Sequence, residues 1–265
     1  MPITDTVVIG AGHAGLAVSA LLSGASRDHV VLDRGRVAER WRTERWDSLR
    51  LLTPNWMSRL PGWFYTWPDQ DGYMSARTLV GHLERYATAF AAPVETGTTV
   101  LSVSKDVSGY EVVTDRGTWR TRHVVIATGP WGRPNVPETV HRLDDDIRLN
   151  TANQYRNPAA LPAGGVLVVG ASSSGTQIAD ELRNAGRDVV LAVGRHTRMP
   201  RRYRGMDIFW WLERTGRLSR TIDDFADPAD ARREPSFQLV GRNEPEEFSE
   251  DLDLAALQAR GVRLT

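Results

Sequence analysis

Two glycine-rich turns, each placed where an apolar strand runs into a helix, constrain this sequence more than any other feature. The first, GAGHAG at 10–15, follows the run TVVI at 6–9, and the second, GASSSG at 170–175, follows VLVV at 166–169. In a turn of the first kind the three glycines allow, in order, a tight bend, close approach of the backbone to a pyrophosphate and close packing of helix on strand. The helix N-terminus offers free N–H groups to the phosphates. One such turn predicts a dinucleotide site, and two predict two dinucleotides that exchange electrons.

Composition excludes several other classes of protein. Lys and Arg balance Asp and Glu at 33 each, so no global basic field attracts nucleic acid or an anionic membrane. The 265 residues contain no cysteine, which excludes disulfides, a thiolate zinc site and a dithiol redox pair within them. No apolar stretch approaches the roughly 20 residues of a membrane helix. We therefore expect a globular, cytoplasmic protein with no metal site, no nucleic-acid partner and no membrane anchor.

The pattern along the chain predicts an α/β fold with two Rossmann-like, parallel-sheet domains and a small antiparallel β-meander in the first. The first βαβ unit has strands at 6–9 and 29–32 around a helix at 14–23, and the second has strands at 166–169 and 189–193 around a helix at 175–185. Between them we expect an irregular tryptophan-rich stretch (36–72), a helix (75–90), meander strands (98–103, 110–114, 118–122), a buried strand (124–126) and a proline-bearing linker (130–162). The tail predicts helices at 208–212 and 252–259 and a strand at 262–264. The expected domains are residues 1–160 for FAD and 161–265 for NAD(P)H.

The residue that ends the second strand of each unit distinguishes the two sites. Asp33 ends the first, and an acid there accepts hydrogen bonds from ribose hydroxyls and repels a 2′-phosphate, so this site should take FAD or NAD. The second unit has no acid there. It has Ser172 in place of the middle glycine and an arginine run that begins at Arg195 and continues through Arg198, Arg201, Arg202 and Arg204. Arginine pairs bidentately with a 2′-phosphate, which predicts NADPH, with Arg195 as the first candidate. The alternative is that these arginines form a solvated or linker-facing basic patch.

Several segments together resemble the flavin-containing monooxygenase family over nearly the whole chain. They are GAGHAGLA, the Arg40-Trp41 segment, LLTPNWMSRLPG, VVIATGPWGRPNVP, YRNPAALP, VLVVGASSSGTQIADEL and VGRHTRMPRRYRG. In that family NADPH reduces FAD, oxygen adds to the reduced flavin, and the hydroperoxide oxidises a small organic substrate. The resemblance and the motifs imply an FAD site made of Gly10, Gly12, His13, Ala14, Gly15, Asp33, Arg34, Arg40, Trp41, Val100, Thr128 and Gly129. They imply an NADPH site made of Gly170, Ser172, Ser173, Ser174, Gly175, Arg195 and Arg202.

The candidate catalytic residue is Asn55, which falls near an asparagine that the family places beside the reacting flavin edge. An amide donor there could steady a flavin hydroperoxide, and the alternative is a loop-capping role after Pro54. His13 could contact a phosphate or the flavin, or simply face a loop. The tryptophans of the irregular stretch, from Trp41 to Trp67, could contact a cofactor or substrate or act as ordinary core residues.

Two departures from the family leave the activity open. The F-x-G-x-x-x-H-x-x-x-Y/W signature is incomplete, because Tyr155 is present but Thr151 stands at the histidine position. Family members also continue to a segment that contacts the flavin ring, so we expect part of the flavin site to be open. Three functions remain: an FAD- and NADPH-dependent monooxygenase, a flavin reductase or oxidase without oxygenation, and a dinucleotide-binding redox-sensing partner without turnover. A disulfide oxidoreductase is disfavoured because Cys-x-x-Cys is absent. The substrate and a homo-oligomeric state are not determined by the sequence.

Overall fold

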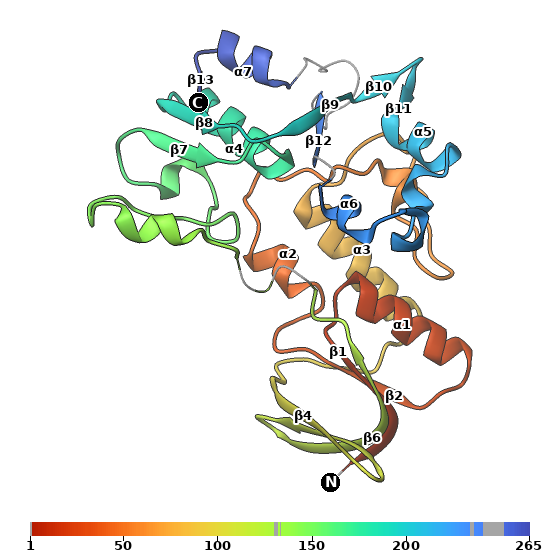
Figure 1. The fold of residues 1–265 in the computed structure, drawn as a ribbon. Coiled ribbons are helices and arrows are strands. Elements are labelled where there is room, and N and C mark those ends of the chain that lie inside the picture. Colours follow the sequence, from red (N-terminus) through yellow and green to blue (C-terminus); the bar gives the residue numbers. More distant parts are fainter. Residues whose placement is uncertain (1, 130–131, 133, 234–235, 241–251) are drawn as a thin grey trace. The chain divides into compact units, whose positions relative to one another are not determined.

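The structure is a computed structural model that describes residues 2–129, 132, 134–233, 236–240 and 252–265. It divides into two compact units (Figure 1). Unit 1 consists of Met1–Trp46, Arg59–Phe64 and Ser75–Tyr155, and unit 2 consists of Asp47–Ser58, Tyr65–Met74 and Arg156–Thr265. Two short stretches of the irregular region therefore belong to the second unit, although they lie early in the sequence.

Unit 1 is a six-stranded mixed sheet with the strand order β3-β2-β1-β6-β5-β4. β1 pairs in parallel with both β2 and β6, and β4, β5 and β6 form the antiparallel meander. Its strands are β1 (Ile3–Ile9), β2 (His29–Leu32), β3 (Val94–Glu95), β4 (Val100–Asp106), β5 (Gly109–Thr114) and β6 (Gly117–Ile126), and its helices are α1 (His13–Gly24), α2 (Glu39–Thr43), α3 (Ala76–Ala89) and the short 3-10 helix η2 (Glu138–Arg142).

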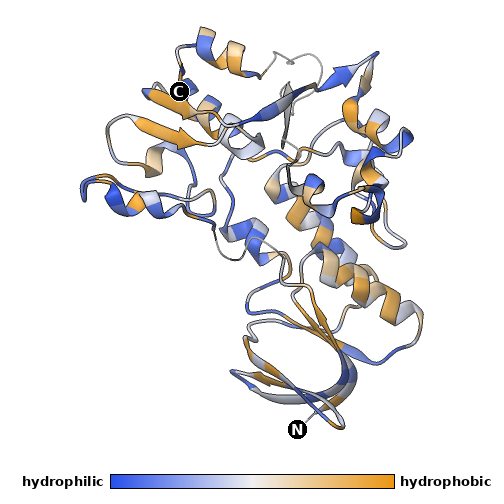
Figure 2. Ribbon diagram, in the orientation of Figure 1, coloured by the Kyte–Doolittle hydropathy of each residue, from blue (hydrophilic) through white to orange (hydrophobic). Residues whose placement is uncertain are grey.

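Alternation along β1 explains why this sheet is covered on both faces. Val7 and Val8 are both fully buried, and they point to opposite sides because successive strand residues alternate. Val8 packs with Val31 and with Val18 and Leu22 of α1. Val7 packs with Val112 and the other apolar residues of the meander side. The parallel strands β1 and β2 thus pack against α1 on one face and against side chains of the meander strands of the same sheet on the other. Figure 2 shows α1 and the central strands as largely hydrophobic.

One predicted strand pair is in fact a single strand. The third meander strand and the buried strand predicted at 124–126 join as β6, whose first half pairs with β5 and whose second half pairs with β1. The prediction of burial is wrong for the last residue, since Ile126 is 73% exposed. A continuous apolar run in the sequence does not show which face of a strand other elements leave uncovered. The error therefore arises from the tertiary arrangement around β6.

Unit 2 repeats the strand order of the first βαβ unit in its three-stranded sheet, β13-β8-β7, in which every pairing is parallel. The sheet consists of β7 (Val166–Val169), β8 (Val189–Ala192) and β13 (Arg263–Leu264). The remaining strands are β9 (His196–Pro200), parallel to β12 (Ser236–Val240), and the hairpin β10 (Arg202–Tyr203) and β11 (Met206–Asp207). The helices are α4 (Ser173–Asn184), α5 (Ile208–Arg214), α6 (Pro228–Arg233) and α7 (Leu254–Ala259), with the 3-10 helices η1 (Asn55–Met57), η3 (Pro158–Ala160), η4 (Arg217–Ser219) and η5 (Ile222–Asp224).

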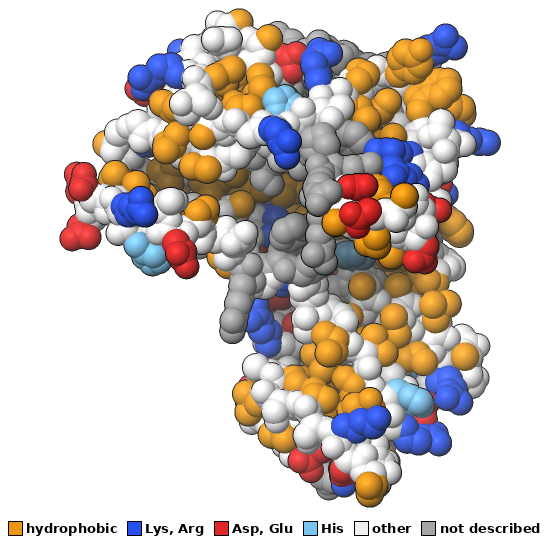
Figure 3. Space-filling model, in the orientation of Figure 1, with side chains coloured by type: hydrophobic (Ala, Val, Ile, Leu, Met, Phe, Trp, Pro, Cys, Tyr) orange, Lys and Arg blue, Asp and Glu red, His pale blue; other side chains and the backbone are white. Residues whose placement is uncertain are grey.

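Surface charge follows the balance of the composition. Figure 3 shows acidic and basic side chains scattered over the visible face, in keeping with a formal net charge of zero. Among the described helices, none is both long and apolar enough to cross a membrane.

Candidate functional site: two dinucleotide-type turns

The first glycine turn has the backbone that a dinucleotide site requires. Gly10 has a φ of +111°, where a Cβ would lie 2.6 Å from the carbonyl oxygen of Ala127. A Cβ on Gly15 would lie 1.8 Å from the carbonyl oxygen of Gly10, so α1 can approach β1 this closely only without a side chain. Gly12 is different, because a Cβ there would meet nothing within 4 Å. The first and third glycines are therefore required by the fold, and the middle one leaves space open at the start of α1.

Asp33 holds this turn in place from the end of β2. One carboxylate oxygen accepts a hydrogen bond from the N–H of Ala11 at 2.7 Å, and the other accepts one from the N–H of Gly35 at 2.8 Å. Each oxygen keeps a further lone pair, so the carboxylate can still accept a ribose hydroxyl. Asp33 therefore couples the strand end to the glycine turn.

Three other predicted FAD-site residues lie together beside the turn. The Nη1 atom of Arg40 is 3.4 Å from the carbonyl oxygen of Thr128, and it would lie 3.4 Å from a Cβ on Gly129. The Ala127–Thr128 backbone in turn adjoins Gly10. The structure thus brings the first glycine turn, Arg40 and the segment Ala127–Gly129 to one place.

The remaining predicted residues of this site have mixed environments. His13 and Ala14 are exposed in the first turn of α1, and the N-cap residue of this helix is Gly12, which has no side chain to cap it. Trp41 is half-buried, with the guanidinium of Arg45 4.9 Å above its ring. Val100 packs its side chain against the core cluster of Val7, Val30, Leu32 and Val112. Its role in the FAD site stays a prediction.

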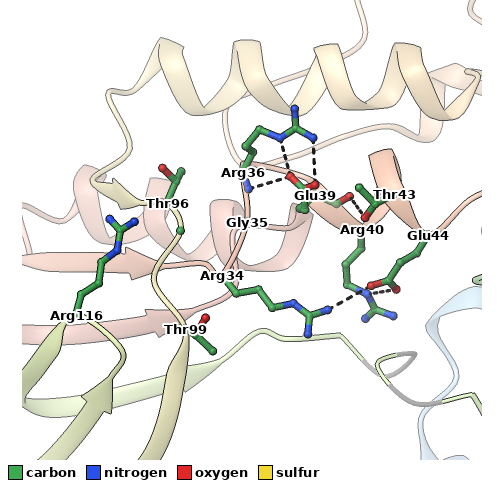
Figure 4. Close-up of a pocket in the computed structure, with 11 residues that line it drawn as sticks. Arg34, Gly35, Arg36, Glu39, Arg40, Thr43, Glu44, Thr96, Thr99 and Arg116 are labelled. Carbon is green, nitrogen blue, oxygen red and sulfur yellow. Dashed lines mark hydrogen bonds and ion pairs between the residues drawn. The ribbon is translucent and has the colours of Figure 1, made fainter.

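A pocket of about 670 Å³ opens beside the end of β2 within unit 1 (Figure 4). It is lined by Arg34, Gly35, Arg36, Glu39, Arg40, Thr43, Glu44, Thr96, Gly97, Thr99 and Arg116. The N–H groups of Gly97 and Thr98 donate to the carbonyl oxygens of Gly35 and Asp33, which fixes the opposite wall. Sequence analysis anticipated Arg34 and Arg40 but missed Arg116, since the meander carries no motif that points to a ligand.

Most of the charge in this pocket is paired. Arg36 donates to both carboxylate oxygens of Glu39, at 2.7 and 3.1 Å, and these hydrogen bonds lower the pKa of Glu39 to about 2. Glu44 accepts from Arg40 at 2.7 Å and from Arg34 at 3.3 Å. The four arginines and two glutamates leave the pocket with a positive balance, which suits an anionic dinucleotide.

The second glycine turn, in unit 2, repeats the backbone of the first. Gly170 has a φ of +101°, and a Cβ on Gly175 would lie 1.7 Å from the carbonyl oxygen of Gly170. Ser172 caps α4 with φ −80° and ψ −176°, against −83° and −177° for Gly12 at α1. Ser172 makes no side-chain capping bond, so its exposed hydroxyl can point to a ligand. The half-buried Ser173 and exposed Ser174 follow at the helix start.

The structure separates the arginines of the predicted basic run. Arg198 pairs with Asp253 at 3.1 Å. Arg195 follows β8 and is exposed, and none of the described carboxylates lies within ion-pair distance of it. Arg202 is half-buried in β10, and the guanidinium of the exposed Arg204 lies 5.4 Å from the ring of Tyr203.

Arg201 is a buried structural residue, contrary to its placement in a ligand-facing or solvated run. It is 5% exposed and pairs with Asp207, itself 3% exposed, at 2.8 Å. Its Nε donates to the hydroxyl of Tyr73, its Nη2 donates to the carbonyl oxygen of Leu52, and Tyr73 donates to Asp207 at 2.7 Å. Burial and the neighbouring Asp207 raise the pKa of Tyr73 to about 12, although Arg201 opposes the shift. This cluster ties the stretches 47–58 and 65–74 to the rest of unit 2.

Asn55 lies in unit 2 and is 1% exposed. Its Nδ2 donates to the backbone oxygen of Asp69 at 2.9 Å and to the carboxylate of Asp69 at 3.1 Å, and Tyr65 donates to the other carboxylate oxygen at 2.6 Å. Both amide hydrogens are therefore used within the protein. The Oδ1 of Asn55 is buried and has no partner among the described residues. The group that Asn55 can offer to a ligand is an acceptor, whereas sequence analysis expected a donor.

The tryptophans of the irregular stretch divide by environment. Trp46 is 4% exposed, and Trp63 packs against His82 and Tyr86 at ring-centroid distances of 6.0 and 5.8 Å. Trp46 is therefore a core residue, and Trp63 is half-buried against α3. Trp67 is 46% exposed and makes an edge contact with Tyr65.

Comparison with known proteins connects these turns to a family. A family profile described as "Pyridine nucleotide-disulphide oxidoreductase" matches residues 7–209. The chain belongs to this family. Within it, the chain is flavin-containing monooxygenase-like: it is 38% identical over 223 residues to an "Uncharacterized oxidoreductase CzcO-like" of Geobacillus kaustophilus, and 30% identical over 211 residues to "Probable indole-3-pyruvate monooxygenase YUCCA1" of Arabidopsis thaliana. These matches cover 83% and 77% of this chain but only 63% and 50% of those relatives.

Solved structures agree with the fold. A flavin-containing monooxygenase from Stenotrophomonas maltophilia matches with a TM-score of 0.67 and 25% identity over 96% of this chain and 77% of that one. OTEMO in complex with FAD and NADP matches with a TM-score of 0.58 and 20% identity over 76% of this chain and 41% of that one. The expected α/β fold of monooxygenase-like flavoproteins is confirmed. Disulphide chemistry in the family's description has no counterpart within these residues, which contain no cysteine.

Proposed function

We propose that this chain binds FAD in unit 1 and NADPH in unit 2 and acts as a monooxygenase-like oxidoreductase on a small organic substrate. One observation carries the proposal. The two glycine turns have the same backbone geometry, yet an acid ends the strand after the first and an arginine follows the strand after the second. The likeness to monooxygenase relatives supports the same pairing of cofactors.

The residues of unit 1 suit FAD. The space at Gly12 admits a pyrophosphate to the N–H groups at the start of α1, and a Cβ there would narrow that approach. Asp33 accepts hydrogen bonds from a ribose, while Arg34 and Arg40 add positive charge beside the phosphates. Thr128 and Gly129 close the turn next to Arg40. Bound FAD would supply hydride acceptance and electron delivery to oxygen.

The residues of unit 2 suit NADPH. Ser172, Ser173 and Ser174 offer hydroxyl groups where α4 begins, and the exposed Arg195 presents a planar guanidinium after β8. A guanidinium binds a 2′-phosphate through two parallel hydrogen bonds, which NADH cannot form. Arg202 is the second candidate for this phosphate.

Asn55 contributes through its carbonyl oxygen in this proposal. Asp69 and Tyr65 hold the amide so that Oδ1 is the free atom, and a buried acceptor without a partner is costly unless a ligand donates to it. Oδ1 therefore accepts an N–H of a bound cofactor or substrate. Asp69 acts as its positioning residue.

The hydrogen bonds between Asn55 and Asp69 favour a second candidate function. With its amide hydrogens bound to Asp69, Asn55 supplies no donor to stabilise an oxygenating species. The candidate is an NAD(P)H-linked flavin reductase or oxidase, in which NADPH, a proton and O₂ give NADP⁺ and H₂O₂. The monooxygenase would instead convert NADPH, a proton, O₂ and substrate to NADP⁺, water and oxygenated substrate.

Visible spectroscopy of the purified chain tests the proposal. We expect flavin absorbance that bleaches anaerobically at least about tenfold faster with NADPH than with NADH, with Arg195→Ala removing most of that preference. Arg198→Ala is the matched control, because Arg198 is already paired with Asp253. The proposal is contradicted if the chain binds no FAD or if neither NADPH nor NADH reduces the bound flavin. Either result favours a dinucleotide-binding, redox-sensing partner that does not catalyse a reaction. In air, peroxide equal to the NADPH consumed favours the reductase or oxidase.

A further inference from the structure

The pocket of unit 1 contains an arginine to which the proposed function gives no role. Arg34 and Arg40 share Glu44, and Arg36 pairs with Glu39. Arg116 lines the same pocket, but no carboxylate among the described residues lies within ion-pair distance of it. Figure 4 shows its guanidinium directed toward Thr96, apart from the paired side chains.

The hairpin turn between β5 and β6 fixes the stem of Arg116. Its backbone N–H donates to the hydroxyl of Thr114 at 3.1 Å, and that hydroxyl donates to the carbonyl oxygen of Gly117 at 2.7 Å. The guanidinium lies against Gly97, where a Cβ would stand 2.9 Å from its Nη2 atom. Gly97 has a φ of +62°, so both its conformation and its lack of a side chain leave room for the planar group.

The pocket wall that contains Gly97 is hydrogen-bonded to Asp33, the residue proposed to bind the ribose. The N–H of Thr98 donates to the carbonyl oxygen of Asp33 at 2.8 Å, and that of Gly97 donates to Gly35 at 3.1 Å. In the proposed site the glycine turn binds the pyrophosphate and Asp33 binds the ribose. The base attached to that ribose points away from the glycine turn, toward the wall that contains Gly97. Arg116 stands over the same wall.

We propose that Arg116 covers one face of the adenine of FAD and makes this site prefer FAD over flavins without adenine. The inference rests on the proposed function of unit 1. A guanidinium is planar and weakly hydrated, so it stacks on an aromatic ring and gains cation–π energy. A second phosphate is a poorer partner, because Asp33 supplies negative charge at this end of the site.

Titration of the apoprotein with FAD and with FMN, which lacks the adenosine part, tests this assignment. Arg116→Ala should weaken FAD binding by about 3- to 30-fold and leave FMN binding within about twofold. Arg116→Trp should retain most of the FAD preference, since an indole also stacks on adenine, whereas Arg116→Lys should behave like alanine. Arg122→Ala is the control, because this arginine of β6 is exposed and lies outside the pocket lining.

Gly97→Ala provides an independent variant, since its Cβ displaces the guanidinium without removing it. It should lower the preference for FAD over FMN in the same direction as Arg116→Ala. Equal losses for FAD and FMN in Arg116→Ala, an unchanged FAD affinity, or full rescue by Arg116→Lys overturns the adenine assignment alone. A wild-type chain that binds neither flavin overturns the proposed function together with this inference.

Discussion

In the first glycine turn, Gly15 is needed for the fold, whereas Gly12 is needed for the proposed binding of FAD. Gly15→Ala places a Cβ 1.8 Å from the carbonyl oxygen of Gly10, so the free energy of unfolding should fall by at least about 2 kcal/mol. Gly12→Ala meets no atom within 4 Å at an ordinary φ of −83°, so stability should change by less than about 1 kcal/mol while FAD affinity falls more than about tenfold. Urea unfolding and FAD titration measure both quantities. Equal destabilisation by the two changes would contradict this division of roles.

The ion pair between Glu39 and Arg36 should make the free energy of unfolding depend on pH. Hydrogen bonds from Arg36 hold the pKa of Glu39 at about 2, below its usual 4.5, so the ion pair stabilises the fold fully above pH 4.5. This contribution should disappear as pH falls from 4.5 to about 2. Because Arg36 is 64% exposed, solvent screening keeps it below about 1 kcal/mol.

The measurement for Glu39 is the difference in urea midpoint between the wild type and Glu39→Gln. The wild type should be more stable at pH 6, and the two proteins should converge near pH 2. Arg263→Ala, which removes an ion pair with Asp188 whose two side chains are both exposed and lie outside the pocket, serves as a reference for non-specific charge effects. A difference that stays constant from pH 6 to pH 2 would show that Glu39 does not contribute through its ionisation.

At the scale of single elements, α3 shows how one side chain sets a helix start. The Oγ of Ser75 accepts a hydrogen bond from the N–H of Thr78 at 3.1 Å, and the helix begins at the next residue. Ser75→Ala should lower the free energy of unfolding by about 1 kcal/mol, while Ser75→Asp keeps an acceptor and should lose less than half of that. Chemical denaturation followed by circular dichroism checks this. If both variants lose the same stability, capping is not the source.

The elements that sequence patterns predict well are those governed by local rules. The helix predicted at 75–90 is Ala76–Ala89, and the strand predicted at 29–32 is His29–Leu32. Capping, apolar periodicity and turn glycines act within a few residues, so one sequence contains the necessary information. The joining of two predicted strands into β6 depends instead on neighbours distant in the sequence.

Site residues divide in the same way. The first and third glycines of both turns were predictable because backbone geometry demands them, and the position of Asp33 was predictable because it directly follows β2. Arg195 and Arg201 are only six residues apart and alike in type, yet one is exposed and the other is 5% exposed. Arg201 differs by its contacts with Asp207, Tyr73 and Leu52. The last two lie in irregular backbone far away in the sequence, which carries no pattern that predicts such contacts.

At the scale of the whole molecule, the chain passes between the two units five times, at residues 46/47, 58/59, 64/65, 74/75 and 155/156. The division by contacts therefore differs from a simple cut in the sequence. A second domain taken as residues 161–265 would omit Asp47–Ser58 and Tyr65–Met74, which belong to unit 2. Those stretches carry Asn55, Asp69 and two partners of Arg201.

This arrangement predicts that the fragment 161–265 does not fold by itself. Without Tyr73 and Leu52, Asp207 is the one hydrogen-bonding partner that the guanidinium of Arg201 keeps among the described residues. A buried charge that loses hydrogen-bond partners is strongly destabilising. We expect the fragment to show no cooperative thermal transition by circular dichroism, while the full chain shows one.

In the full chain, Asp207→Asn should lower the free energy of unfolding by about 3 kcal/mol and Tyr73→Phe by about 1 kcal/mol. A fragment that melts cooperatively near the full-chain midpoint would instead establish residues 161–265 as an autonomous domain, with the early stretches as accessories to it.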